Sequence, residues 1–195
     1  IETIPKPQIG PDEFLLKVMA TGICGTDVVE WYRLPKAPRV LGHEATGIIE
    51  KIGEKVTKYN VGDRVFVSHH VPCNQCCYCQ KESHTSCETL HTTNYYPGGF
   101  SQYIRVPKIN VENGVYMLPL TMSYEEGTFI EPLACAVRGQ RLSDINKFDS
   151  VLIIGSGMAG ILHIQLAKMK GVQKIFACDI NPDRLELAKK FGAKY

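Results

Sequence analysis

Five cysteines lie within residues 72–87, where the sequence is PCNQCCYCQKESHTSC. Four of them, Cys73, Cys76, Cys79 and Cys87, have the spacing C-x2-C-x2-C-x7-C. Gaps of two residues allow neighbouring thiolates to face one centre from a tight loop, and Zn²⁺ accepts four sulfur ligands in tetrahedral geometry. The spacing therefore predicts a structural zinc site, with Cys77 as the spare cysteine.

Two alternatives for this cluster stay open at the level of sequence. A [4Fe–4S] cluster also uses two-residue gaps, but its pattern has a Cys-Pro after a short third gap, and Cys87 is followed by Glu88. Disulfide bonds are the other alternative. A closed four-cysteine zinc site has no open coordination position, so it would stabilise a lobe without catalysing a reaction.

A second group of metal-binding residue types is spread over three stretches. Cys24 lies in TGICGTD, His43 and Glu44 lie in LGHEATG, and Glu131 lies in FIEPLAC. A catalytic zinc takes three protein ligands and keeps one position open, and Cys24, His43 and one carboxylate would supply the three. A lone cysteine is more often a core residue and a lone histidine a satisfied polar group, so spacing alone leaves both interpretations open.

The glycine-rich stretch GSGMAG occupies residues 155–160. It follows an apolar run, opens a helix-like segment and precedes an aspartate nineteen residues after its last glycine. In this context the pattern predicts dinucleotide binding, with the pyrophosphate at the helix N-terminus and the carboxylate at the ribose. The predicted coenzyme-binding residues are Gly155, Gly157, Met158, Ala159, Gly160, Asp179 and Arg184.

The elements that must hold these residues differ along the chain. Short β-branched runs at 12–23, 44–53, 63–68 and 100–107 favour a small barrel or sandwich, and residues 121–142 favour a helix with a Thr or Ser cap. From residue 150 the order strand, helix, strand, helix predicts the start of a parallel α/β sheet. We expect one domain at 1–149 and part of another at 150–195, because two strands cannot complete a doubly wound sheet.

Composition narrows the class of partner. The 195 residues are 44% hydrophobic and 22% charged, with a net charge of +2, which argues against a nucleic-acid surface. The apolar run at 151–167 is interrupted by three glycines, a His and a Gln, so we expect no membrane span. Cysteines at metal spacing in a chain of this size favour the reducing cytoplasm.

Five motifs occur together in one order: CGTD, GHEATGIIEKIGEKVTKYNVGDRV, the four-cysteine lobe, EPLACAV and VLIIGSGMAG. In this the chain resembles the zinc-dependent medium-chain alcohol dehydrogenases, most of all the polyol (sorbitol) and threonine dehydrogenase branch. The resemblance covers nearly the whole chain. It implies a GroES-like catalytic domain at 1–149, with the lobe at 73–87, and the N-terminal part of an NAD-binding Rossmann domain at 150–195. It also implies one catalytic and one structural zinc per subunit, NAD, and a homo-oligomer of the dimer or tetramer type.

The resemblance also assigns roles to residues of the predicted catalytic zinc site. Cys24 and His43 match catalytic zinc ligands, and Glu44 matches a residue that binds the metal or lies just outside it. Glu131 matches a carboxylate in the region where liver-type enzymes place a second cysteine. This departure favours a zinc with one thiolate and harder oxygen ligands.

Two further residues match the proton path of the family. Thr26 matches the hydroxyl that relays the substrate proton. His70, three residues before Cys73, matches a histidine near the active site of threonine dehydrogenases, and its neighbour His69 competes for that placement.

The implied function is NAD-dependent oxidation of a small secondary alcohol, polyol-like or threonine-like. A zinc-independent quinone-reductase-like member of the superfamily is one alternative, and it would lack Cys24, His43 and the cysteine lobe. A non-catalytic zinc-binding module is the other. It predicts basic or aromatic residues on the lobe, where only Lys81 and Tyr78 are found.

Overall fold

The computed structural model describes residues 1–37 and 39–194, which form two compact units that divide between Ile130 and Glu131. Helix α6 (Ile130–Leu142) falls with the second unit, where Ala136 packs against Leu162 and Leu166. The compact units therefore divide earlier than residue 149. The domain boundary between residues 149 and 150 stays a prediction.

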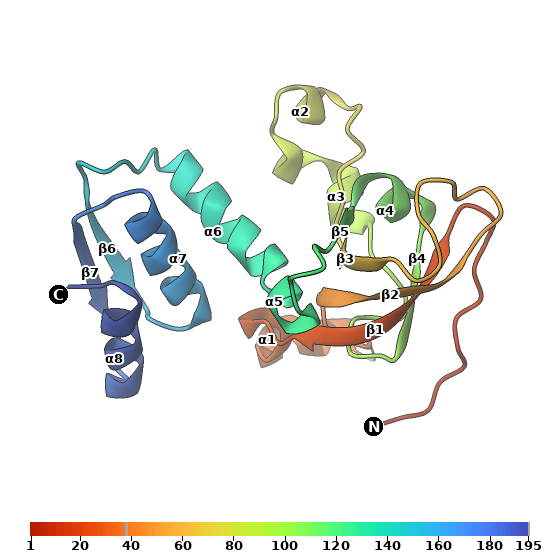
Figure 1. Ribbon diagram of the computed structural model, residues 1–195, viewed down its shortest axis with the longest axis horizontal. Helices are drawn as coiled ribbons and strands as arrows, with labels where there is room; N and C mark the ends of the chain where they lie inside the picture. Colours follow the sequence, from red (N-terminus) through yellow and green to blue (C-terminus); the bar gives the residue numbers. More distant parts are fainter. Residues whose placement is uncertain (38, 195) are drawn as a thin grey trace. The chain divides into compact units, whose positions relative to one another are not determined.

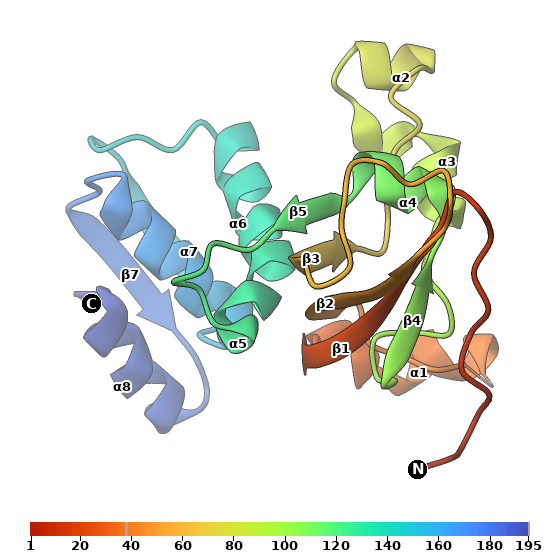
Figure 2. The same ribbon diagram turned by 45° about the vertical axis from the view of Figure 1, so that its right-hand side comes forward.

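The first unit is built on a five-stranded antiparallel sheet with the strand order β4-β1-β2-β3-β5 (Figures 1 and 2). Its strands are β1 (Phe14–Gly22), β2 (Glu44–Ile52), β3 (Arg64–Ser68), β4 (Tyr103–Val106) and β5 (Val115–Met117). The four runs predicted from sequence are confirmed as β1 to β4. Strand β5 was not expected.

Short helices fill the connections of this unit. They are η1 (Gly25–Asp27), α1 (Glu30–Arg33), η2 (Leu34–Lys36), α2 (Cys77–Gln80), η3 (His84–Ser86), α3 (Glu88–Thr92), α4 (Lys108–Asn113) and α5 (Tyr124–Thr128). Figure 1 shows α2 at the tip of a lobe that stands away from the sheet.

Side chains from one face of the sheet form the core, among them Phe14, Leu16, Ile49 and Ile104, all without solvent exposure.

The pairing of β1 with β2 sets where the candidate metal ligands lie. Strands β1 and β2 pair as far as Gly22 opposite Glu44, and Glu44 is the first residue of β2. The segment after β1 and the segment before β2 therefore meet at one end of the sheet.

The predicted helix over 121–142 is two helices in the structure, which corrects the expectation. Ser123 caps α5, accepting a hydrogen bond from the Glu126 N–H, and the helix ends at Thr128 before α6 begins at Ile130. Pro132 explains the interruption, because it has no N–H and its ring would clash with the Thr128 carbonyl in a continuous helix.

The second unit contains β6 (Ser150–Ile154), α7 (Met158–Met169), β7 (Lys174–Cys178) and α8 (Pro182–Phe191). Strands β6 and β7 are parallel, as the sequence predicts. Ile153, Ile164 and Ile175 are buried between the strands and helices. Gly171 and Gly192 follow the two helices with φ of 85° and 134°, a region that only glycine adopts readily.

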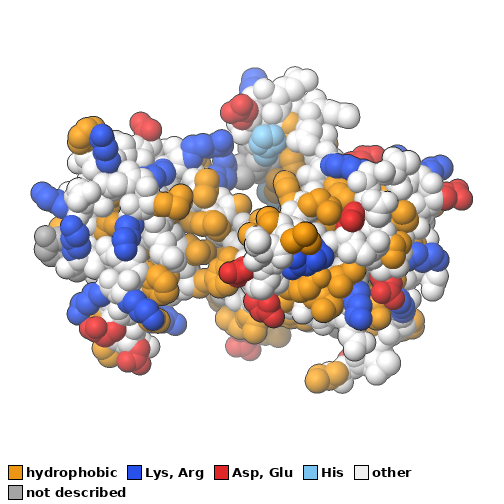
Figure 3. Space-filling model, in the orientation of Figure 1, with side chains coloured by type: hydrophobic (Ala, Val, Ile, Leu, Met, Phe, Trp, Pro, Cys, Tyr) orange, Lys and Arg blue, Asp and Glu red, His pale blue; other side chains and the backbone are white. Residues whose placement is uncertain are grey.

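The apolar run at 151–167 is divided between β6 and α7. Among the described residues, no helix combines the length and the apolar character of a membrane span. Figure 3 shows basic and acidic side chains next to one another on both units, consistent with the small net charge.

Candidate metal centres and coenzyme loop

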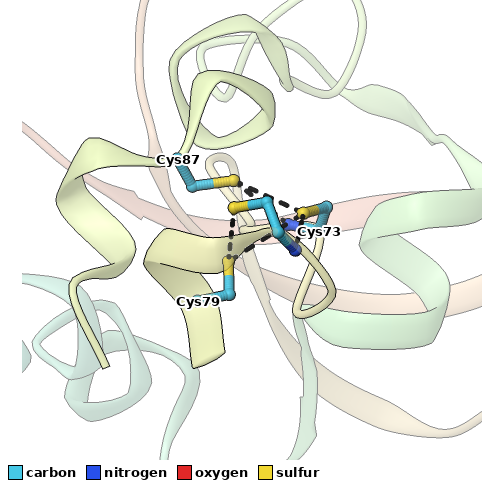
Figure 4. Close-up of side chains that lie close together, drawn as sticks. Cys73, Cys79 and Cys87 are labelled. Atoms are coloured by element: carbon cyan, nitrogen blue, oxygen red, sulfur yellow. Dashed lines mark hydrogen bonds between the residues drawn. The ribbon is translucent and has the colours of Figure 1, made fainter. Parts of the chain in front are cut away.

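The four cysteines predicted from spacing lie together in the lobe between β3 and β4. Figure 4 shows the sulfur atoms of Cys73, Cys79 and Cys87 directed toward one another. The Sγ–Sγ distances are 3.5 Å for Cys76–Cys79, 3.7 Å for Cys73–Cys87 and 3.9 Å for Cys73–Cys79. A tetrahedral zinc with Zn–S bonds of about 2.3 Å holds its sulfurs about 3.8 Å apart. The four side chains therefore fit one zinc ion.

The same distances disfavour the alternatives for this cluster. All four cysteines are free, and their separations far exceed the S–S bond of about 2.05 Å. An iron–sulfur cubane places several atoms between its ligands and would spread the cysteines more widely. Cys77 is exposed at the start of α2 and lies outside the group.

Backbone amides prepare this cluster for a cation. The N–H of Cys73 donates to Cys87 Sγ and lowers the pKa of that thiol to about 6. The N–H groups of Gln75 and Cys76 lower the pKa of Cys73. Burial has the opposite effect on Cys79 and raises its pKa to about 12. Because zinc binds thiolates, metal binding here would displace the proton of Cys79.

Cys24, His43 and Glu44 form a second group, whose candidate ligand atoms all lie within 4.8 Å of one another. Cys24 follows β1 at the start of η1, and His43 directly precedes Glu44 at the start of β2. One thiolate, one imidazole and one carboxylate are the donor types of a catalytic zinc. The donor set and its spacing therefore fit zinc with an open position.

Gly22 makes room for the carboxylate of this group. A Cβ atom on Gly22 would overlap Glu44 Oε2, and Glu44 is only 2% exposed. The close approach of the β1 backbone to the Glu44 side chain therefore requires a glycine. This is a physical reason for Gly22 that the sequence motif alone does not supply.

Asp27 completes the group and was missed by sequence reasoning. Its Oδ1 lies 3.5 Å from His43 Nδ1, its Oδ2 accepts the Cys24 N–H at 3.1 Å, and its side chain is 2% exposed. A carboxylate that faces Nδ1 favours the tautomer with its proton on Nδ1, which leaves Nε2 available to bind a metal. The available signal was its position three residues after Cys24 in CGTD.

The two neighbouring histidines have different surroundings. The ring of His69 lies between those of His43 and His70, at centroid distances of 4.8 Å and 4.0 Å, and burial lowers its pKa to about 2. His70 has its Nδ1 2.6 Å from the Thr93 carbonyl oxygen, and burial lowers its pKa as well. His69 is thus in ring contact with His43, while the role expected of His70 stays a prediction.

Glu131 is in the first turn of α6 and belongs to the second unit. Its Oε1 lies 3.7 Å from Cys135 Sγ. Its membership of the catalytic metal site stays a prediction.

The glycine-rich loop joins β6 to α7. Gly155 has φ of 92°, Gly157 is the N-cap of α7, and a Cβ on Gly160 would overlap the Gly155 carbonyl oxygen. Met158 and Ala159 occupy the first turn of α7, where free N–H groups favour an anion. This geometry fits the pyrophosphate of a dinucleotide.

Asp179 lies just beyond β7 and is hydrogen bonded to this loop. Its Oδ2 accepts the Ser156 N–H at 2.7 Å and its Oδ1 accepts the Asn181 N–H at 2.9 Å. These bonds, Asn181 first, lower the pKa of Asp179. Arg184 Nη1 lies 3.9 Å from Oδ2. Each carboxylate oxygen keeps a second lone pair, so ribose hydroxyls can still donate to it.

Comparison with known proteins identifies the family. The model of the alcohol dehydrogenase GroES-like domain matches residues 10–115, which contain both metal-binding groups of the first unit. The chain belongs to the alcohol dehydrogenase family. The resemblance inferred from the five motifs is confirmed.

Relatives within the alcohol dehydrogenase family include polyol dehydrogenases and an L-threonine 3-dehydrogenase. The chain is 35% identical to sorbitol dehydrogenase of Bacillus subtilis, covering 100% of this chain and 56% of the relative. It is 36% identical to D-xylulose reductase A of Aspergillus niger, covering 98% and 55%. Acetophenone reductase of Geotrichum candidum, solved in complex with NAD, matches with a TM-score of 0.84 and 30% identity over 98% of this chain and 57% of that one. The chain thus spans about half the length of the relatives it matches.

Proposed function

We propose that the chain is the catalytic and first coenzyme-binding part of a zinc-dependent dehydrogenase. The protein would transfer hydride between a secondary alcohol, polyol-like or threonine-like, and NAD. The observation that carries the proposal is the pair of different metal-binding groups in one unit, one with four cysteines and one with mixed donors. The first suits a structural ion and the second a catalytic one.

We assign the catalytic zinc to Cys24, His43 and one carboxylate, from Glu44 or Glu131. Glu44 is supported by its place within 4.8 Å of the other two donor atoms. Bound zinc would polarise the alcohol oxygen and favour loss of its proton near neutral pH. The remaining steps depend on side chains of this chain.

Thr26 is the proposed proton relay. Its hydroxyl is two residues from Cys24, and it would accept the proton of the alcohol while donating its own toward solvent. His70 is the proposed next group on this path. The Thr93 carbonyl accepts its Nδ1–H and so leaves Nε2 as the proton acceptor.

We assign the coenzyme to the loop of Gly155, Gly157, Met158, Ala159 and Gly160. The N-terminus of α7 would hold the pyrophosphate, and Asp179 and Arg184 would flank the adenosine ribose. Hydride transfer is the chemistry of the nicotinamide, so the protein's contribution is to orient it and to exclude water.

The structural zinc is assigned to Cys73, Cys76, Cys79 and Cys87. The presence of both metal groups favours the dehydrogenase over a zinc-independent reductase, which needs neither, and over a zinc-binding module, which needs one. We further propose a homo-oligomeric, cytoplasmic enzyme without nucleic-acid or membrane partners. The free cysteines at metal spacing support the reducing compartment.

A substrate panel on the full-length protein tests this function. Sorbitol, xylitol, other polyols, threonine and simple secondary alcohols would each be supplied with NAD, and NADH formation followed by absorbance. We expect turnover with at least one polyol or with threonine, and none in Cys24→Ser at equal folded concentration. Quinone reduction without alcohol oxidation would instead support the zinc-independent alternative.

A further inference from the structure

Arg33 connects the residues around the candidate catalytic metal, although no motif includes it. It is the last residue of α1, and its side chain is 17% exposed. Its Nε donates to the Thr26 carbonyl oxygen at 2.6 Å, and its Nη2 donates to Thr26 Oγ1 at 3.2 Å and to Asp27 Oδ1 at 2.9 Å. One side chain thus holds two consecutive residues of the CGTD segment.

Through Asp27 this arginine is linked to His43. Asp27 Oδ1 is shared by Arg33 Nη2, by the Gly42 N–H at 3.4 Å and by His43 Nδ1 at 3.5 Å. A carboxylate that is 2% exposed is costly to keep charged without a cationic partner. Arg33 is that partner, and its charge-assisted hydrogen bond fixes the carboxylate in the orientation that faces the imidazole.

The contact with Arg33 also limits which hydrogen bonds the Thr26 hydroxyl can form. A threonine hydroxyl has one proton and two lone pairs, whereas a guanidinium only donates. Arg33 therefore occupies one lone pair of Thr26 Oγ1. One lone pair and the O–H are left, and these are the two groups that a proton relay uses.

We propose that Arg33 is a positioning residue that orients the Thr26 hydroxyl and, through Asp27, the His43 imidazole. The inference rests on the proposed function for the role of Thr26, but its metal-binding half depends only on the Cys24, His43 and Glu44 group. Lysine would not replace arginine, because the two contacts to Thr26 and the contact to Asp27 require a planar fork with several donors.

The first test measures zinc retention and needs no turnover. In the full-length protein, a chelator would remove zinc from the parent, Arg33→Gln, Arg33→Lys and Arg105→Gln, and a chromophoric indicator would report its release. Arg105 is a matched control, because its Nε lies 3.9 Å from Glu13 in an ion pair elsewhere on the same unit. The phase of zinc release that is missing in Cys24→Ser is the one that belongs to this site.

We expect release from this site to accelerate at least tenfold in Arg33→Gln, within the range of about 10–100-fold for loss of an outer partner of a metal ligand. Arg33→Lys should also release faster than the parent, and Arg105→Gln should match the parent. Parent-like release in both Arg33 variants would overturn the link to His43. If Arg33→Gln does not fold, Arg33→Lys carries the comparison.

The second test is a double-mutant cycle with Thr26→Val. Arg33→Gln should lower kcat about tenfold and leave the coenzyme KM unchanged, while in the Thr26→Val background the same change should cost less than about threefold. If the double variant instead loses kcat by the product of the two single losses, the proposal that Arg33 orients Thr26 is overturned. A full-length parent that oxidises no alcohol would refute the proposed function, and the release rates would still decide the metal-binding half.

Discussion

Asp179 illustrates, at the residue scale, how one carboxylate can hold a loop and face a ligand. Its two oxygens accept the N–H groups of Ser156 and Asn181, and its side chain is 5% exposed. The carboxylate is therefore fixed beside the glycine-rich loop before any coenzyme binds. A rigid, charged acceptor discriminates between ligands more sharply than a mobile one, because it does not move away from an unfavourable group.

This geometry predicts a preference for NAD over NADP. A 2′-phosphate would meet Asp179 as a like charge, and Arg184, with its Nη1 3.9 Å from the carboxylate, would offset part of the repulsion. We expect kcat/KM to favour NAD by at least about tenfold, or about 1.4 kcal/mol. Asp179→Ser should reduce the preference. Equal or better efficiency with NADP in the parent would make Arg184 the dominant contact.

The lowered pKa of Asp179 also predicts a pH-dependent contribution to stability. The folded pKa lies below the unfolded value of about 3.9, so the stabilisation is complete above about pH 4 and is lost as the pH falls through the folded pKa. Asp179→Asn should therefore unfold at lower urea concentration than the parent at pH 7, and the difference should shrink below about pH 4. A difference that stays constant across the pH series would contradict this contribution.

At the scale of elements, sequence pattern predicted most of the strands and helices but not all of their ends. Short β-branched runs revealed β1 to β4, and glycines marked the ends of α7 and α8. Strand β5 has only three residues, too few for a period, and it is defined by pairing with Val65–Val67. The contacts that Asp27 and His69 make with His43 were also out of reach, because they arise only when separate segments meet.

The close approach of β1 to Glu44 predicts that alanine substitutions at two nearby glycines differ in their effect on stability. Gly22→Ala would push a Cβ into the buried Glu44 carboxylate, and overpacking of this kind costs about 1–3 kcal/mol. Gly25→Ala would meet nothing within 4 Å. Urea unfolding should show a loss for Gly22→Ala and little change for Gly25→Ala. Equal stability of the two variants would mean that Glu44 can move aside freely.

The geometry of the lobe predicts that serine substitutions at two adjacent cysteines differ in their effect on stability and zinc content. Cys76 lies 3.5 Å from Cys79 within the four-cysteine group, whereas Cys77 is exposed outside it. Cys76→Ser should lower the melting temperature and the zinc content, because structural zinc contributes folding free energy directly. Cys77→Ser should melt like the parent. A large loss in Cys77→Ser would show that the ligand set is wrong.

At the scale of the whole molecule, the first unit holds both metal groups and the second holds the coenzyme loop. Sequence pattern indicated this division because Cys24, His43, Glu44 and the four cysteines all precede the apolar run that opens the glycine-rich stretch. It could not name the alcohol, since substrate contacts come from scattered side chains and the chain spans about half the length of its relatives. The full-length protein is therefore the object for tests of activity.

The decisive measurement is the zinc content of the purified full-length protein, compared with that of Cys24→Ser. Two zinc ions per chain in the parent and one in the variant, with turnover lost and the melting temperature nearly kept, are the values expected of one catalytic and one structural site. A parent with a single zinc, or a Cys24→Ser variant that keeps two and still oxidises the alcohol, would contradict the assignment of Cys24 and His43 to a catalytic metal.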